Sequence, residues 1–259
     1  MHIDVITQAK SQSTARRKHV APRWVEGLGS PVQEQLCRAF AFARKRWNRT
    51  RSRALSEGVI HTLDHDAFDS IFRKYAAYFR PTPYSKYLNV RHWLFDSAER
   101  YYLHKLDRLP AGRKFLDIGS GGGFFLVVCR HLGHQVQGLD IGTWPIFNDL
   151  IEFFGIDRIE HRIKPGVQLP NFGQRFDVVT AFMTGFDKTA DGMPWDEEQW
   201  IPFLTDLRQY VVDGGIVIIK FIACKKTGEY YGTSARLAIK QMPQFNARFC
   251  RDSVRLVAI

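Results

Sequence analysis

The stretch KFLDIGSGGGFF, residues 114–125, constrains the fold of this chain more than any other feature. A short strand-like run ends near Asp117, a turn built mainly of glycine follows, and an apolar helix-like run begins directly after it. A glycine-rich turn between a strand and a helix leaves backbone N–H groups free to hold a ligand, and nucleotides or nucleotide-like cofactors are the usual occupants. The stretch therefore predicts a ligand site at the carboxyl end of the first strand of a parallel sheet.

Strand-like and helix-like runs alternate along the chain from residue 114 onward. Near-continuous apolar strands that alternate with helices indicate a parallel sheet covered on both faces. We therefore expect an α/β fold with a doubly wound, Rossmann-like, mostly parallel sheet, closed by a C-terminal antiparallel hairpin within 246–259. The expected strands are 114–119, 134–141, a weaker 157–163, 175–183 and 214–222, and the expected helices are 122–133, 143–155 (capped by Thr143) and 196–212.

Two helices are expected before this alternation begins. Ser30 and Pro31 are typical of a helix start and predict a helix over 31–48. A second helix is expected over 91–108, ended by Pro110. The first helix should pack an apolar stripe on the body of the protein and turn its cations outward. The stripe consists of Val32, Leu36, Phe40, Ala43 and Trp47.

Composition changes near residue 110, because the sequence before it is helical in pattern, aromatic and basic. We therefore predict a basic N-terminal helical region and cap at 1–110 and a cofactor-binding core at 111–259. The formal net charge is +11, and much of the excess lies in ARKRWNRTRSR at 43–53. A field of this kind attracts polyanions or anionic surfaces, although a solvated basic face is an equally good interpretation.

The four cysteines are far apart and form no C-x-x-C pair. This spacing indicates reduced thiols and favours a cytoplasmic protein without a disulfide framework. No apolar run approaches the roughly 20 residues that a transmembrane helix needs. The cysteines are Cys37, Cys129, Cys224 and Cys250.

The residues around the turn limit the kind of ligand. Gly119 and Gly121 begin a dinucleotide-type motif, but Phe124 stands where the third glycine would be, and no phosphate-loop lysine follows. Asp117 would repel a pyrophosphate and attract an ammonium group. Asp140, about 20 residues after Gly119, suits ribose hydroxyls. A ligand with a ribose, an amino-acid ammonium and no phosphate is S-adenosylmethionine.

LDIGSGGG at 116–123 followed by GLDIG at 138–142 resembles the class I S-adenosylmethionine-dependent methyltransferases. The resemblance covers about 110–222, and GHQVQGLD at 133–140 is similar to the motif of small-molecule O-methyltransferases of the ubiquinone-biosynthesis kind. The resemblance implies that Asp117 orients the methionyl ammonium and that Asp140 binds the ribose. It also implies that Ile141 lies beside the adenine and that the methionyl end faces Ala181 and Phe182. The residues implied to pass under the cofactor are Gly119, Ser120, Gly121 and Gly123.

One departure from the family pattern concerns the adenine. Relatives often carry an aspartate after the third strand, and the matching position here, 164–166, holds no carboxylate. Adenine recognition is therefore expected to rest on backbone groups and on Val167.

Methyl transfer is an in-line displacement that depends chiefly on alignment of donor and acceptor. A hydroxyl acceptor also needs a base, and Asp187, in the loop after the fourth strand, is the candidate. Tyr84 and Tyr87 are candidates for closing over the cofactor. The resemblance implies O-methylation of a small molecule or a glycan intermediate.

Two further functions stay open at this point. The chain could be an RNA methyltransferase that holds phosphates with the basic segment 43–53. It could also be a non-catalytic cofactor-binding protein, although an intact glycine turn argues against that class. His61 and His65 have a spacing that chelates zinc on one helix, but no third ligand stands nearby, so no metal is expected. The acceptor and the oligomeric state are left open.

Overall fold

The computed structural model describes residues 30–76, 85–182, 184–188, 193–222, 232–250 and 252–259. Contacts divide the chain into two compact units, Met1–Arg51 and Ser52–Ile259. This division lies before the predicted boundary at residue 110, because the segments that precede the sheet share its core. Val59 and Leu94, for example, are fully buried in one apolar cluster with Leu126. The functional division at residue 110 stays a prediction.

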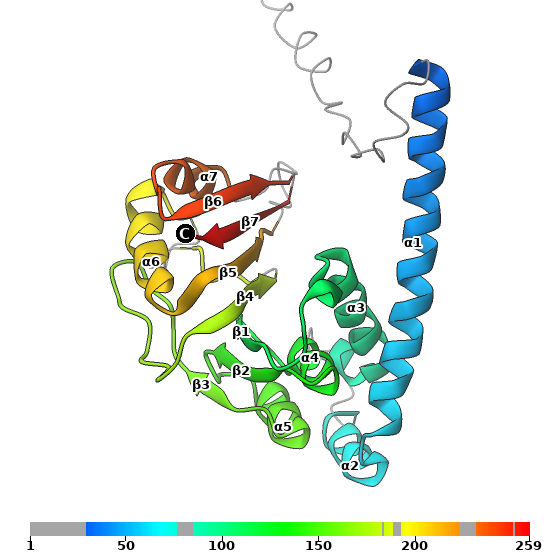
Figure 1. Cartoon of the computed structure of the whole chain (residues 1–259). Helices are drawn as coiled ribbons and strands as arrows, with labels where there is room; N and C mark the ends of the chain where they lie inside the picture. The colour runs from blue at the N-terminus through cyan, green and yellow to red at the C-terminus, as the bar shows by residue number, and fades with distance from the viewer. Residues whose placement is uncertain (1–29, 77–84, 183, 189–192, 223–231, 251) are drawn as a thin grey trace, which may run out of the picture. The chain divides into compact units, whose positions relative to one another are not determined.

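The larger unit is built on one sheet of seven strands in the order β3-β2-β1-β4-β5-β7-β6 (Figure 1). Strands β3, β2, β1, β4 and β5 pair in parallel, and β7 and β6 join them antiparallel. The predicted mostly parallel sheet with a C-terminal hairpin is confirmed. The strands are β1 (Lys114–Ile118), β2 (Gln135–Asp140), β3 (Arg158–Glu160), β4 (Phe176–Phe182), β5 (Val211–Lys220), β6 (Phe245–Phe249) and β7 (Ser253–Ala258).

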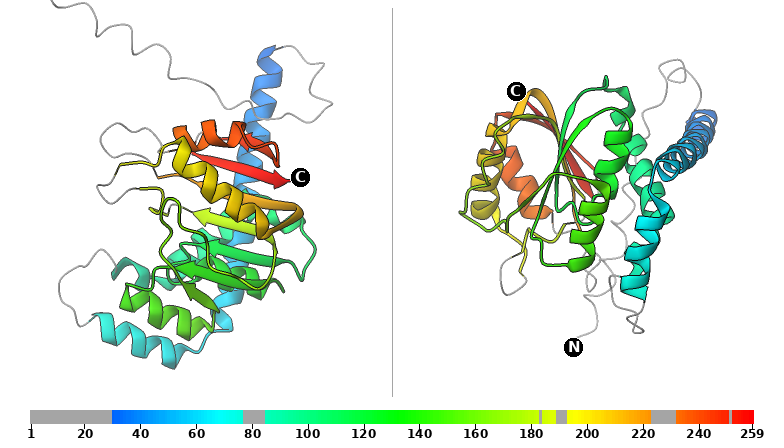
Figure 2. Two further views of the ribbon diagram at one scale, coloured as in Figure 1. Left: turned by 90° about the vertical axis from the view of Figure 1, so that its left-hand side faces the viewer. Right: turned by 90° about the horizontal axis from the view of Figure 1, so that it is seen from below.

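Helices cover both faces of this sheet. Figure 2 shows α4 (Phe124–His131) and α5 (Pro145–Phe154) on one side, and α6 (Glu197–Gln209) and α7 (Thr233–Lys240) on the other. Successive side chains of a strand point to opposite faces. Accordingly, Val178 packs in a cluster with Phe125 of α4, whereas Val179 packs in a cluster with Leu204 of α6. The doubly wound arrangement is thus confirmed.

Three further helices precede the sheet, α1 (Ser30–His61), α2 (His65–Ala76) and α3 (Val90–Leu103), with a short 3₁₀ turn η2 (Ser85–Leu88) before α3 and another, η3 (Leu106–Arg108), after it. Helix α1 is much longer than the predicted 31–48, because no proline follows Pro31 before Pro81 and the first glycine after it is Gly58. Helix α3 ends earlier than predicted, since Lys105 adopts a left-handed backbone conformation with φ of 57°.

Two local predictions were wrong. Helix α5 begins at Pro145 after an extended Trp144 that provides no side-chain cap, so Thr143 is not the cap. The apolar stripe of α1 was expected to be covered, but Trp47 is 64% exposed and Phe40 42% exposed. Periodicity locates an apolar stripe on a helix, but it does not show that another element covers the stripe.

Candidate functional site

The glycine turn connects β1 to α4 at the carboxyl end of the sheet. Its backbone is fixed by the neighbouring strand, since the N–H groups of Gly119 and Ser120 donate to the carbonyl of Leu139 at 2.7 and 3.2 Å. Gly119 has φ of 71°, and a Cβ there would overlap the methyl group of Thr184. The turn therefore requires glycine at 119 for two reasons, and the loop after β4 lies directly against it.

Asp117 is the last polar side chain before the turn and is only 5% exposed. The Thr180 hydroxyl, on the adjacent strand β4, donates to its Oδ1 at 2.6 Å. Burial raises the pKa of Asp117 to about 7, against the opposing effect of the Thr180 hydrogen bond. A carboxylate in this position is poorly compensated, and a bound cation would restore its ionised form.

Asp140 ends β2 and faces the same turn. The Gly121 N–H donates to its Oδ2 at 2.8 Å, and the Ile141 N–H donates to its Oδ1 at 2.7 Å. A carboxylate has about four acceptor positions, so both oxygens keep capacity for further donors. Asp140 therefore fixes the turn and can also accept from a ligand.

Glu160 is a carboxylate of this region that the sequence analysis missed. It ends β3 and is the register partner of Asp140. Its carboxyl group packs on Gly142, where a Cβ would overlap it, and its Oε1 accepts from Arg158 at 2.7 Å. The sequence analysis expected adenine recognition without an acid, because 164–166 holds none, whereas Glu160 stands slightly earlier, at the end of the strand itself. A carboxylate closing the short run RIE was the available signal.

Three further residues were predicted to bind the cofactor, namely Ser120, Ile141 and Phe182. Ser120 lies in the turn, and its buried hydroxyl has no hydrogen-bond partner among the described residues. Ile141 adjoins Asp140 and is half-buried. Phe182 is instead 8% exposed and packs between the rings of His104 and Phe125.

Of the two other predicted residues, one lies outside the turn, and the other closes it, since the Gly123 N–H donates to the Ser120 carbonyl at 2.9 Å. Val167 is 49% exposed in the loop after β3. Gly123 ends the turn as the N-cap residue of α4, one residue before the helix begins. Their roles toward a cofactor stay predictions.

Asp187 lies in the loop after β4 and is 3% exposed. Its backbone carbonyl accepts from the Trp195 N–H at 2.9 Å, whereas its Oδ1 is buried without a partner among the described residues. Burial raises the pKa of Asp187 to about 6. The same loop carries Thr184, which rests on Gly119. A desolvated carboxyl group with a raised pKa near a ligand turn suits proton transfer.

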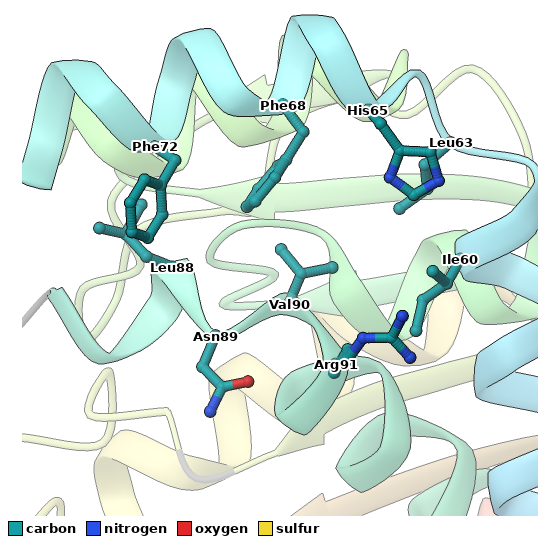
Figure 3. A pocket seen from close by; sticks show the side chains of 9 residues that line it. All are labelled: Ile60, Leu63, His65, Phe68, Phe72, Leu88, Asn89, Val90 and Arg91. Carbon is teal, nitrogen blue, oxygen red and sulfur yellow. The ribbon is translucent and has the colours of Figure 1, made fainter.

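A cavity of about 270 Å³ lies between α2 and the junction of η2 with α3 (Figure 3). Phe68 and Phe72 project into it from α2, and Leu88 and Val90 form the opposite wall. The guanidinium of Arg91, which also lines the cavity, is held by the Glu57 carboxylate at 2.7 and 2.8 Å. The lining is completed by Ile60, Leu63, His65 and Asn89.

Two aromatic rings, Tyr87 and Phe147, connect the chain beside this wall to the glycine turn. Tyr87, next to Leu88, contacts the Phe147 ring edge-on with centroids 4.7 Å apart. Phe147 in turn lies 3.7 Å from the place of a Cβ at Gly121. Tyr87 also stacks on Trp93 at 4.7 Å. The cavity and the turn are therefore neighbouring features, while Tyr84 falls outside the described residues.

His61 and His65 do not share a helix, because α1 ends at His61 and α2 begins at His65. The zinc spacing considered for them therefore does not apply. Within the described parts of the chain, no group of three or more His, Cys, Asp or Glu side chains is placed to hold a metal ion. The helices in those parts also include none with the length and apolar character needed to cross a membrane.

Comparison with known proteins gives a partial match. No family model matches the chain. A ubiquinone biosynthesis O-methyltransferase of Ruegeria sp. (strain TM1040) is 31% identical over 120 residues, which are 46% of this chain and 44% of that protein. The chain thus matches less than half the length of this curated relative. The match supports the predicted relationship to class I methyltransferases.

Solved structures with a similar arrangement include proteins named as methyltransferases. Streptomyces venezuelae DesVI is 12% identical, with a TM-score of 0.49 over 64% of this chain and 92% of its own. The glycopeptide N-methyltransferase MtfA in complex with S-adenosyl-L-methionine is 12% identical, with a TM-score of 0.42 over 62% and 92%. The Rossmann-like fold follows from the strand order of the chain itself.

Proposed function

We propose that this chain is an S-adenosylmethionine-dependent methyltransferase that methylates a hydroxyl group of a small molecule or glycan intermediate. The observation that carries the proposal is the glycine turn between two carboxylates, Asp117 and Asp140, at the ends of adjacent parallel strands. That arrangement suits a ligand with an ammonium group and ribose hydroxyls and repels one with a pyrophosphate. The match to an O-methyltransferase over part of the chain supports it.

The residues of the turn fit this cofactor. Ser120 offers a buried hydroxyl without a partner among the described residues. Asp140 keeps acceptor capacity beyond the two backbone N–H groups that it already holds. Asp117 has a desolvated carboxyl group that a cation would stabilise in its ionised form. Each of these three polar side chains can therefore bind a polar group of the cofactor.

S-adenosylmethionine, when bound, supplies a methyl group on a positively charged sulfur. In our proposal, the Asp117 carboxylate accepts hydrogen bonds from the ammonium group, and Asp140 accepts from the ribose hydroxyls. Glu160 adds a second carboxylate beside Asp140 for the ribose or adenine end. Gly119 and Gly121 keep the backbone close to the ligand because neither carries a Cβ. These residues align the donor, and alignment alone can contribute about 7–11 kcal/mol to catalysis.

Asp187 is proposed as the base that takes the proton from the acceptor hydroxyl. A pKa near 6 leaves it mostly ionised at neutral pH and still basic enough to accept a proton as the oxygen loses it. Its Oδ1 has no competing donor among the described residues. Thr184, in the same loop, touches Gly119, and this contact supports a position of the loop beside the cofactor.

The cavity beside Tyr87 is proposed to hold the apolar part of the acceptor. Its walls are mainly aliphatic and aromatic, and Arg91 is already neutralised by Glu57. A hydroxyl on such an acceptor would extend past Tyr87 toward the turn. The relative's role in ubiquinone biosynthesis is consistent with an acceptor that has an apolar portion.

An RNA acceptor is the second candidate, and its support is the exposed basic segment of α1. Arg44, Lys45, Arg46 and Arg49 are all exposed. The cavity, the buried Asp187 and the partial match to an O-methyltransferase favour the small molecule. A cytoplasmic location is part of the proposal, since the dispersed cysteines suit a reducing compartment.

The test is methyl transfer from S-adenosylmethionine to a panel of phenols and sugars, with RNA as a parallel substrate. We expect turnover of a small hydroxyl compound, and we expect Asp187→Asn to retain binding of S-adenosylhomocysteine while losing turnover. Methylation of RNA alone would replace the leading proposal by the second candidate.

A further inference from the structure

The N-terminal unit presents a helical surface that the proposed methyl transfer does not use. It lies on α1 between Phe40 and Arg49. Residues three, four and seven apart share one side of a helix. Phe40, Ala43 and Trp47 are therefore on one side, and Phe40 and Trp47 are 42% and 64% exposed. We call this side the aromatic face of α1.

Cations surround the aromatic face. Lys45 and Arg49 lie on the opposite side of the helix, and Arg44 and Arg46 flank the aromatic face on its two edges, as their spacing from Trp47 requires. All four are exposed. No aspartate or glutamate occurs between Gln35 and Ser56.

These charges are also uncompensated in space. Among the contacts of the described residues, none of Arg44, Lys45, Arg46 or Arg49 takes part in an ion pair. Glu57, the first acidic residue after the segment, forms an ion pair with Arg91. The segment therefore carries a dense positive field that a large anionic partner would neutralise.

We propose that α1 binds an anionic membrane surface, with Trp47 and Phe40 inserted at the level of the lipid headgroups. A helix with lysine and arginine on its polar side and tryptophan or phenylalanine on the other is typical of helices that lie in the membrane interface. The guanidinium groups of Arg44 and Arg46 bind lipid phosphates, while the aliphatic parts of these side chains lie along the aromatic face. Clusters of four or more cations on such a helix recognise anionic lipids.

Phe42, which is 69% exposed, lies on the same side of α1 as Lys45 and Arg49. Proteins that bind single strands place aromatic rings beside the cations that hold the phosphates, so this side is the one that RNA would use. The aromatic face carries two large rings and is flanked by two arginines, and this arrangement favours a membrane. A flat anionic surface can meet the aromatic face and both flanking arginines at the same time.

The experiment is sedimentation of the full chain with vesicles of phosphatidylcholine alone or mixed with phosphatidylserine. We expect binding only to the mixed vesicles, weakened by salt. The triple variant R44Q/R46Q/R49Q, which removes both flanking arginines, should lose at least about tenfold in vesicle affinity, since each basic residue near an anionic surface contributes substantially. Trp47→Ala should weaken binding separately.

The matched control is R73Q/R108Q/K240Q, which removes the same total charge from exposed positions outside the N-terminal unit. It should bind mixed vesicles like the parent chain. Equal loss in both triple variants, equal binding to neutral vesicles, or no vesicle binding would overturn the proposal. If the chain binds polyuridylate but no vesicles, and R44Q/R46Q/R49Q loses the polyuridylate binding, the surface would be assigned to RNA instead. Thermal unfolding of each variant reports folding, independently of any methyltransferase activity.

Discussion

Asp140 and Glu160 are register partners at the carboxyl ends of β2 and β3, so two carboxylates stand side by side at the edge of the glycine turn. Their surroundings differ. Asp140 is held by the backbone N–H groups of Gly121 and Ile141. The Glu160 side chain is 60% exposed and pairs with Arg158. Asp140 therefore organises the turn, while Glu160 is free to adjust to a ligand.

The first prediction separates these two acids. Asp140→Asn keeps the shape of the side chain but replaces one acceptor oxygen by a donor group that faces a backbone N–H. We expect the affinity for S-adenosylhomocysteine to fall by about 10- to 100-fold, because hydrogen bonds to charged groups contribute roughly 1.5–3 kcal/mol. Glu160→Gln should lower it by less than tenfold. Titration calorimetry measures both, and the reverse order of effects would contradict the assignment.

The second prediction concerns the contact between Gly119 and Thr184. Gly119→Ala adds a left-handed backbone penalty of about 1–2 kcal/mol and an overlap with the Thr184 methyl group. Gly173→Ala is the matched control, since Gly173 has φ of 66° and open space around it. We expect Gly119→Ala to lower the free energy of unfolding clearly more than the control does. Thr184→Ser should recover part of the difference.

If both alanine variants lose the same stability in urea unfolding, Thr184 does not rest on Gly119. The loop after β4 would then lie apart from the turn, and the placement of Asp187 beside the cofactor would lose its support.

The parts of the site that follow from local sequence were predictable. Asp117 and Asp140 end strands whose apolar runs are long enough to recognise, and parallel strands bring their carboxyl ends to one edge. Glu160 was missed because β3 has three residues, and its end is defined by pairing with Asp140 rather than by any pattern of its own. The register of a strand depends on its partner, which a local pattern does not reveal.

Features that depend on tertiary packing were not predictable. The cavity exists because Phe68 and Phe72 of α2 face Leu88 of η2, and no pattern in the sequence indicates that these residues lie close together. Helix α7 was missed because its eight residues are too few for a strong periodic pattern. Asp187 was chosen from its place after β4, but its burial, on which its chemistry depends, required the structure.

The third prediction follows from the raised pKa of Asp117. The folded chain keeps this proton up to about pH 7, whereas an unfolded chain releases it near the ordinary value of 3.8. The folded state therefore binds more protons between these values and loses stability as the pH rises through them. The free energy of unfolding of Asp117→Asn, relative to that of the parent chain, should therefore be roughly 1–4 kcal/mol higher at pH 8 than at pH 4. Thermal unfolding of both chains at the two pH values measures this difference.

The same variant should bind S-adenosylhomocysteine more weakly, because an amide cannot neutralise the ammonium group. A variant that is less stable at pH 8 and binds the ligand unchanged would show that Asp117 has a purely structural role.

The fourth prediction concerns the pH dependence of turnover. Burial raises the pKa of Asp187 to about 6, so the ionised base forms as the pH rises through 6. We expect kcat with a hydroxyl acceptor to rise through that range and level off above it. Asp187→Asn should lower kcat by about 10²- to 10⁴-fold and remove the dependence near pH 6. Glu198→Gln, at an exposed position of α6, should change neither. An unchanged profile in the Asp187 variant would assign the proton transfer to another group.

The most direct test of the central claim is titration calorimetry of the full chain with S-adenosylhomocysteine and, separately, with NADH. The account predicts micromolar binding of S-adenosylhomocysteine, no comparable binding of NADH, and loss of the signal in Gly121→Val, which forces a branched side chain into a left-handed turn beside Phe147. Tighter binding of NADH, or binding of S-adenosylhomocysteine that survives Gly121→Val unchanged, would contradict it.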